Sequence, residues 1–302
     1  MTKKTHFQKL GARTWADWLM IVLFAALAFV TVYPFYNILI LSMNDAQDAM
    51  TGGIYWWPRK WTLDNFKLFF ATNDIFRSFY ITVARTVIGS LAATFFTAMF
   101  AYVISKKYLV GRAFLTVLTM IPMYIGGGVI PYFLLIQGIG LYQNFLVYII
   151  PCLFSSYNCL IMLTFFRGLP PDIEESAKID GANDLLIFLR IVIPVSMPMI
   201  ATILLFNAVG HWNSWYDSML FGGQNLVTLQ MRLVQLIKDA EIGTKMAQMM
   251  GSRVGITSLG MKPTVQSVKV TAMAVTVVPI MLVYPFLQKY FVKGVMIGSI
   301  KG

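Results

Sequence analysis

Polar and aromatic side chains interrupt the apolar stretches of this sequence mainly around residue 210. Polar groups inside long apolar segments are candidates for function, because burying them costs free energy. Aromatic rings stack on the C–H faces of sugars, and amides exchange hydrogen bonds with hydroxyl groups. Together they predict part of a passage for a sugar, formed by Asn158, Asn207, His211, Trp212 and Asn213.

Simpler interpretations of the same residues stay open. Trp and Tyr gather where a membrane meets water, so Trp215 and Tyr216 beside this group are better explained as an interfacial belt. A single buried histidine usually fills space, and no second histidine stands near His211. We therefore expect no metal site here, because metal sites collect several ligands.

A second group of chemically distinct residues lies in the segment 167–194. Pro170 and Pro171 end the preceding segment, and Asp172 is the expected N-cap of a short helix. Gly181 allows a sharp turn, and Pro194 breaks or bends the chain further on. The segment therefore predicts a helix, a turn and a second helix, with acidic residues at Asp172, Glu174, Glu175, Asp180 and Asp184.

The composition shows which kind of protein must position these residues. The chain has 302 residues, of which 58% are hydrophobic and 12% are charged, and its mean hydropathy is +0.68. These values exclude a disordered chain, a disulfide scaffold and an ordinary cytosolic enzyme. The net charge of +11 comes from basic residues scattered through loops and tails. We expect an all-α polytopic membrane protein that binds no nucleic acid.

Six apolar segments are long enough to cross a bilayer as helices. Each has about 23–27 residues, and about 20 suffice to span the hydrocarbon layer. The third segment contains Pro122, Gly126–Gly128 and Pro131, so we expect it to be kinked or unwound. The whole chain, 1–302, then forms one transmembrane domain with spans at 18–41, 79–104, 113–136, 144–166, 195–220 and 265–291.

The distribution of Lys and Arg predicts how the chain is oriented. Basic residues cluster in the N-terminal tail, in the loop after the second span and in the C-terminal tail, whereas 137–143 has none. The positive-inside rule then places both termini in the cytoplasm. The loop 167–194 is cytoplasmic, and the loops 42–78 and 221–263 are extracytoplasmic. Within the last loop, 229–237 has the spacing of an amphipathic helix.

At the segment 167–194 the chain resembles a known family. The permease subunits of ATP-binding-cassette (ABC) importers carry a cytoplasmic motif, EAA-x3-G-x9-I-x-LP. Here Ser replaces the first Ala and Ile193 replaces the Leu, and the spacing agrees throughout. The motif positions are occupied by Glu175, Ser176, Ala177, Gly181, Ile191 and Pro194. Over essentially its whole length the chain is similar to the maltose-transport-type sugar permeases.

The resemblance implies a function and a set of partners. The motif would dock as a coupling helix on one of two ATPase subunits, and a second homologous permease would complete the path. An extracytoplasmic solute-binding protein would deliver a sugar or oligosaccharide. The basic charge balance leaves an acidic sugar open, although topology explains the loop charges better. The chain lacks the phosphate-binding G-x-x-x-x-G-K-[ST] loop. We therefore expect a non-catalytic subunit of a bacterial inner membrane, without a cofactor of its own, whose partners bind ATP and Mg²⁺.

An ion-coupled secondary transporter of small polar solutes is the alternative. Such carriers usually bury acidic residues or histidine to bind the coupling ion. Here Asp17 and Asp217 lie near the ends of apolar segments, which counts against this alternative. Arg85 lies inside the second span, and two interpretations of it stay open: a functional group, or a side chain that extends to the membrane surface.

Overall fold

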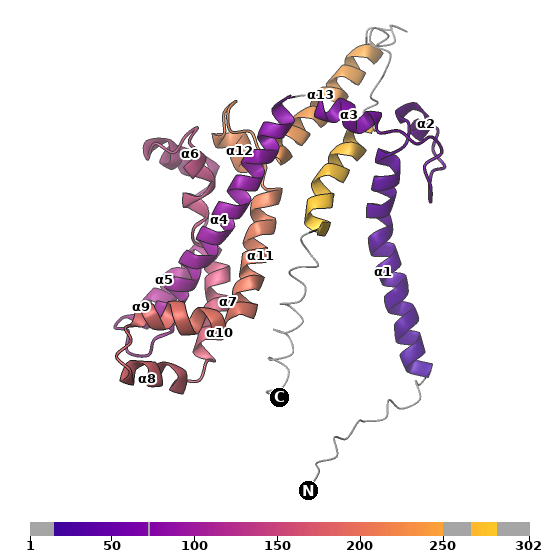
Figure 1. Ribbon diagram of the computed structural model, residues 1–302. Coiled ribbons are helices and arrows are strands. Elements are labelled where there is room, and N and C mark those ends of the chain that lie inside the picture. Colours follow the sequence, from indigo (N-terminus) through magenta and orange to yellow (C-terminus); the bar gives the residue numbers. More distant parts are fainter. Residues whose placement is uncertain (1–14, 72, 250–266, 283–302) are drawn as a thin grey trace. The chain divides into compact units, whose positions relative to one another are not determined.

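The computed structural model describes residues 15–71, 73–249 and 267–282 (Figure 1). These residues form helices joined by turns and one isolated β-bridge, between Asn44 and Trp61. The all-α class is therefore confirmed. The chain divides into two compact units, one comprising 1–69 and 247–277, the other 70–246 and 278–302.

The first unit is built around one long apolar helix. α1 (Trp15–Ser42) exposes most of its large hydrophobic side chains, as expected for a helix in contact with lipid or another membrane helix. Two short helices follow, α2 (Ala46–Met50) and α3 (Asp64–Phe70). The buried amide of Asn65 donates hydrogen bonds to the carbonyls of Ser42 and Asn44, at 3.1 and 2.8 Å. This fixes α3 to the end of α1.

The second unit is a bundle in which α4 packs along α7 and α11 (Figure 1). The elbow, defined here as residues 172–187, lies at one end of this unit, and α13 lies at the opposite end. A further helix, Ser267–Leu282, crosses the boundary between the units. The elements are α4 (Asn73–Ser105), α5 (Arg112–Tyr124), α6 (Val129–Gly138), the 3₁₀ helices η1 (Phe145–Tyr148) and η2 (Ile150–Cys152), α7 (Ser156–Arg167), α8 (Asp172–Ile179), α9 (Asp184–Ile187), the π-helix η3 (Phe188–Val192), α10 (Ile193–Val195), α11 (Met197–Asn213), α12 (Tyr216–Phe221) and α13 (Leu229–Met249).

The apolar segments differ from six straight helices. α1 and α4 are each long and apolar enough to cross a membrane alone. Three further segments are bent helix pairs, broken by 116° between α5 and α6, 46° between η2 and α7, and 85° between α10 and α11. The break predicted in the third span is confirmed. Of the sixth span only residues 267–282 are described, so the count of six stays a prediction.

Two of the predicted continuous helices are wrong in detail. The segment 144–166 begins as 3₁₀ turns that contain Pro151, and regular α-helix starts at Ser156. A proline removes one backbone donor and clashes with the preceding turn, which explains the break. The segment 195–220 ends its regular helix at Asn213, and α12 follows after Ser214 and Trp215.

The helix predicted within the loop 221–263 is confirmed. It is α13, which begins at Leu229 and continues well past the predicted 229–237. The Thr228 hydroxyl lies 3.4 Å from the backbone nitrogen of Met231, and Leu229 and Leu233 are buried. Leu229 and Leu233 are one turn apart and so share one face of the helix.

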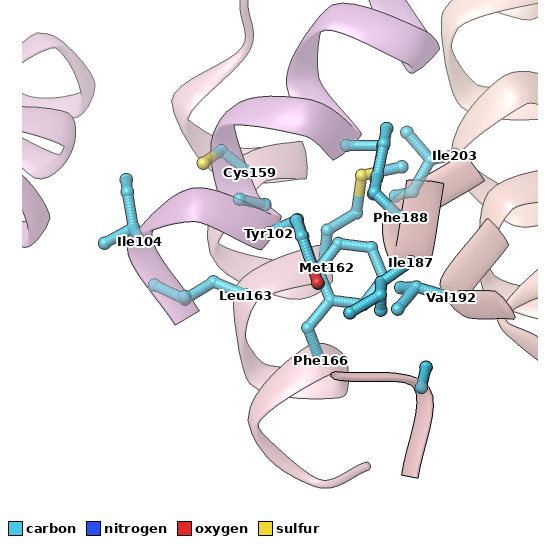
Figure 2. Packing of buried hydrophobic residues seen from close by; sticks show 13 residues of the cluster. Tyr102, Ile104, Cys159, Met162, Leu163, Phe166, Ile187, Phe188, Val192 and Ile203 are labelled. Carbon is cyan, nitrogen blue, oxygen red and sulfur yellow. The ribbon is translucent and has the colours of Figure 1, made fainter. Parts of the chain in front are cut away.

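The main core of the second unit lies between α4, α7 and the elbow (Figure 2). Buried side chains of α4 and α7 meet those of α8, α9 and η3 there, so the elbow is packed against the bundle. The cluster comprises Ala98, Ala101, Tyr102, Ile104, Cys159, Met162, Leu163, Phe166, Ala177, Ile187, Phe188, Val192 and Ile203.

Candidate functional site

The elbow has the helix–turn–helix form that its sequence predicts. α8 ends in a turn in which the N–H of Ala182 bonds the carbonyl of Ala177 and the N–H of Gly181 bonds that of Lys178, each at 3.0 Å. This is the Schellman arrangement, which requires a left-handed residue after the helix. Gly181 supplies it with φ of +80°. The side chain of Asn183 then caps α9 by accepting from the N–H of Leu186, at 2.8 Å.

One detail of this prediction is wrong. Asp172 is the first residue of α8, and Pro171 occupies the N-cap position without a side-chain hydrogen bond. A proline suits the start of a helix because its missing N–H has no partner there anyway. Asp172, Glu174 and Glu175 still lie in the first turn, where their negative charge is favourable.

Two groups of polar contacts fasten the elbow to the end of α4. The Lys106 ammonium pairs with the Glu174 carboxylate and lies 3.6 Å from the centre of the Tyr102 ring. The Tyr108 hydroxyl donates to Asp184 at 2.8 Å, and Lys178 pairs with the same carboxylate at 3.3 Å. Desolvation lowers the pKa of Lys106, whereas the Tyr108 hydrogen bond and Lys178 lower the pKa of Asp184.

The motif residues divide between the core and the surface. Ala177 is buried and Ile191 packs at the edge of the core, so these two hold the elbow in place. Glu175, Ser176, Gly181 and Pro194 are exposed. Beside them the large apolar side chain of Ile179, at the end of α8, is 87% exposed.

The predicted passage residues are only partly brought together. The Asn158 amide donates to the side-chain oxygen of Asn207 at 2.9 Å, and the Asn207 amide donates to the Thr94 hydroxyl at 2.9 Å. These two hydrogen bonds, here called the polar chain, thus link α7, α11 and α4 within otherwise apolar surfaces. His211 is buried against Gly89, where an added Cβ would lie 2.6 Å from the imidazole ring. Asn213 is exposed and bonds the carbonyl of Val209 at 3.0 Å.

A cavity of about 920 Å³ lies beside this polar chain. Asn158 and Trp212 line it, and Thr86 contributes a buried hydroxyl for which the described residues provide no hydrogen-bond partner. The Phe79 and Trp212 rings meet edge to face on its wall, at 6.2 Å. Its lining is mostly apolar and includes no charged side chain among the described residues; the remaining members are Val83, Val87, Tyr157, Leu205, Phe206, Ala208, Val209, Gly210, Pro279 and Ile280.

Comparison with known proteins identifies the family of this chain. Residues 85–297 match the family model described as "Binding-protein-dependent transport system inner membrane component". The chain belongs to this family. It is a permease component, and this membership favours binding-protein-dependent transport over ion-coupled transport.

Several relatives of this permease have names that describe carbohydrate transport. The polygalacturonan/rhamnogalacturonan transport system permease protein YtcP of Bacillus subtilis is 35% identical, over 91% of this chain and 94% of that protein. The arabinooligosaccharides transport system permease protein AraQ of Halalkalibacterium halodurans is 25% identical, over 95% and 97%.

A solved structure has the same fold. It is a bacterial ABC transporter "involved in the import of the acidic polysaccharide alginate". One of its chains superposes with a TM-score of 0.80 at 26% identity, covering 93% of this permease and 99% of that chain.

Arg85 of the permease is one residue whose role the sequence left open. Its side chain is 1% exposed, and its two terminal nitrogens bond the two oxygens of Asp217 at 3.1 and 2.5 Å. The guanidinium also lies 4.4 Å from the centre of the Tyr148 ring. Extension to the membrane surface is therefore wrong: an arginine buried in a bundle is stable only when its charge is paired.

Hydroxyl and backbone contacts around this ion pair fix the start of α13. The Leu229 N–H donates to the Thr82 hydroxyl at 2.8 Å, and the Thr228 N–H donates to that of Ser218 at 3.0 Å. The Tyr148 hydroxyl bonds the carbonyl of Leu226. α4, η1 and α12 thus meet the base of α13 through polar contacts.

Sequence reasoning missed three contributors to these sites. Thr94 completes the polar chain, Asp217 neutralises Arg85, and Lys106 holds the elbow. Thr94 stands in an apolar helix with no local signal. Asp217 and Arg85 are polar residues within predicted spans, and the only available hint was that each needs an opposite charge.

Proposed function

We propose that this permease imports an oligosaccharide as one subunit of an ATP-driven transporter of the bacterial inner membrane. Two ATPase subunits, a second homologous permease and an extracytoplasmic solute-binding protein complete the transporter. The observation that carries the proposal is the elbow, whose outer surface is exposed while its inner surface is buried in the core. The elbow exposes several large apolar side chains, those of Ile179, Leu185 and Leu186, and a group of exposed apolar side chains is what a surface covered by a partner presents.

The elbow passes motion from the ATPase to the membrane helices. Closure of the ATPase pair around ATP moves the two elbows of a permease pair together, and the bundles change between inward-facing and outward-facing packing. Such a change needs a solid connection between elbow and bundle. The buried side chains of Ala177 and Ile187 in the elbow, and of Phe188 directly after it, provide one. Figure 2 shows Ile187 and Phe188 in the core.

This mechanism requires the elbow in the cytoplasm and α13 outside. The distribution of Lys and Arg supports that orientation, with both termini cytoplasmic. The elbow and α13 lie at opposite ends of the second unit, which agrees with it (Figure 1). α13 is then available to the solute-binding protein.

The solute path includes the cavity beside the polar chain. Trp212, Phe79 and Tyr157 offer rings to sugar faces, and Asn158 and Thr86 offer hydrogen bonds to hydroxyls. Asn207 acts through Asn158, to which it is bonded. His211 serves packing, and the exposed Asn213 lies at the end of α11. The second permease closes the remaining side.

The relatives suggest an acidic oligosaccharide as the solute. The polygalacturonan/rhamnogalacturonan relative is 35% identical, against 25% for the arabinooligosaccharide relative. The uncharged lining of the described cavity leaves recognition of carboxylates to the binding protein or the second permease.

Uptake by the reassembled transporter tests this function. Permease, partner permease, ATPase and binding protein are placed in lipid vesicles and offered galacturonate oligomers or neutral arabinose oligomers of matched length. We expect uptake that requires both ATP and the binding protein, with galacturonate oligomers preferred. Uptake driven by an ion gradient without ATP would contradict the importer assignment, and equal uptake of both sugars would contradict the acidic preference.

A further inference from the structure

Glu174 and Glu175 are neighbours in the elbow with opposite surroundings. Glu175 is exposed, on the surface left for a partner. Glu174 turns toward its own bundle and pairs with Lys106, whose side chain is 9% exposed. A charge this deeply buried is stable only beside an opposite charge, so each member of this pair depends on the other.

The surroundings of Lys106 continue this contact into the core. Its ammonium lies over the ring of Tyr102, at 3.6 Å. That ring packs on Phe188 at 5.1 Å and on Phe166 at 6.2 Å, and Figure 2 shows all three in one cluster. Contacts therefore run from the Glu174 carboxylate of the elbow to Lys106, just beyond the end of α4, and from Lys106 into the aromatic core.

A second contact prevents rotation about the first. Tyr108, three residues after α4 ends, bonds Asp184 at 2.8 Å, on the far side of the turn. Lys178 of α8 pairs with the same carboxylate and lies 4.6 Å from the centre of the Tyr108 ring. Two separated attachment points allow less relative movement than one.

We propose that the Lys106–Glu174 pair makes the elbow and α4 a single rigid lever. Glu174 is then a positioning residue that acts within its own chain, whereas Glu175 meets the partner. The lever carries motion to Thr94 and Arg85, because both stand on α4. This inference rests on the proposed coupling function, but it concerns only the route that the motion takes inside this permease.

Charge reversal tests the pair in the complete, reconstituted transporter. We expect Glu174→Lys and Lys106→Glu each to lower the sugar imported per ATP hydrolysed by at least about fivefold, the low end of ordinary coupling effects. ATPase binding should remain, since the exposed surface is unchanged. Combining both reversals should restore most of the ratio. Lys107→Glu is the matched control, because it makes the same charge change at an exposed neighbour and should have little effect.

Specificity of the rescue separates positioning from a general charge effect. Lys106→Glu should not rescue Glu175→Lys, because Glu175 does not face Lys106. Rescue of both reversals alike, or no rescue of Glu174→Lys in a complex that assembles normally, would overturn the proposal.

Cross-linking tests rigidity directly. Cysteines replace Lys106 and Glu174 in a background without Cys152 and Cys159, and a short bifunctional thiol reagent joins them. Because the cysteines remove the ion pair, a rigid lever predicts that linking them raises uptake above that of the unlinked cysteine variant. Loss of uptake only after linking would show that the elbow must move against α4, and would overturn the lever. Absence of ATP-dependent uptake in the unmodified transporter would instead contradict the proposed function.

Discussion

At the scale of single residues, the buried charges of this permease are explained by partners far away in the sequence. Arg85 and Asp217 lie 132 positions apart and form a two-bond ion pair. Lys106 and Glu174 lie 68 positions apart and form another. A sequence shows that an arginine in an apolar segment needs a counter-charge, but not which acid supplies it. Gly181, by contrast, was predictable, because a left-handed turn after a short helix favours glycine.

The Arg85–Asp217 pair leads to a prediction about stability. Asp217→Leu alone leaves a buried, unpaired arginine and should destabilise the fold by about 3–5 kcal/mol. The double variant with Arg85→Met removes both charges and should recover most of that loss. Thermal unfolding of the purified permease in detergent measures both. Equal stability of the single and double variants would show that the pair is not coupled.

At the scale of elements, the sequence predicted which segments are helical better than where they bend. The glycines at 126–128 revealed the 116° break, and Pro151 could have revealed the 46° one. The π-helix η3 has no sequence signal of its own, and its Phe188 and Val192 pack into the core. The elbow was predictable from Pro171, Gly181 and Asn183, although its attachment to α4 was not.

The attachment at Asp184 makes the elbow sensitive to pH. Its hydrogen bond from Tyr108 and its pair with Lys178 lower the pKa of Asp184, so the ionised form stabilises the elbow. That contribution is fully present above the unfolded pKa of about 4 and is lost as pH falls through the lower folded pKa. Hydrogen exchange of 176–187, corrected for intrinsic rates, should therefore accelerate in acid.

Tyr108→Phe provides the control for this pH effect. It removes the principal cause of the lowered pKa of Asp184. The acid-induced loss should then be smaller and be complete at a higher pH, because the folded pKa lies closer to the unfolded one. Unchanged exchange across this range in the unmodified permease would show that Asp184 does not hold the elbow.

At the scale of the whole molecule, composition and the spacing of one motif are sufficient to predict the family. Folding adds an exposed elbow surface at one end of the second unit and a polar, hydrogen-bonded base for α13 at the other (Figure 1). The cavity and the chain from Asn158 to Thr94 lie on the helices that connect the two ends. This arrangement suits a transporter in which movement of the elbow at one end opens the solute path at the other.

The central claim is that the elbow couples ATP hydrolysis to import, and the ratio of sugar imported to ATP hydrolysed measures it most directly. In vesicles containing the complete transporter, Glu175→Lys should lower this ratio at least about tenfold, equivalent to about 1.4 kcal/mol, while ATP hydrolysis continues. Lys107→Glu, a charge reversal of the same size at an exposed residue outside the elbow, should leave the ratio unaffected. A Glu175→Lys transporter that assembles normally and keeps the unmodified ratio would contradict the account.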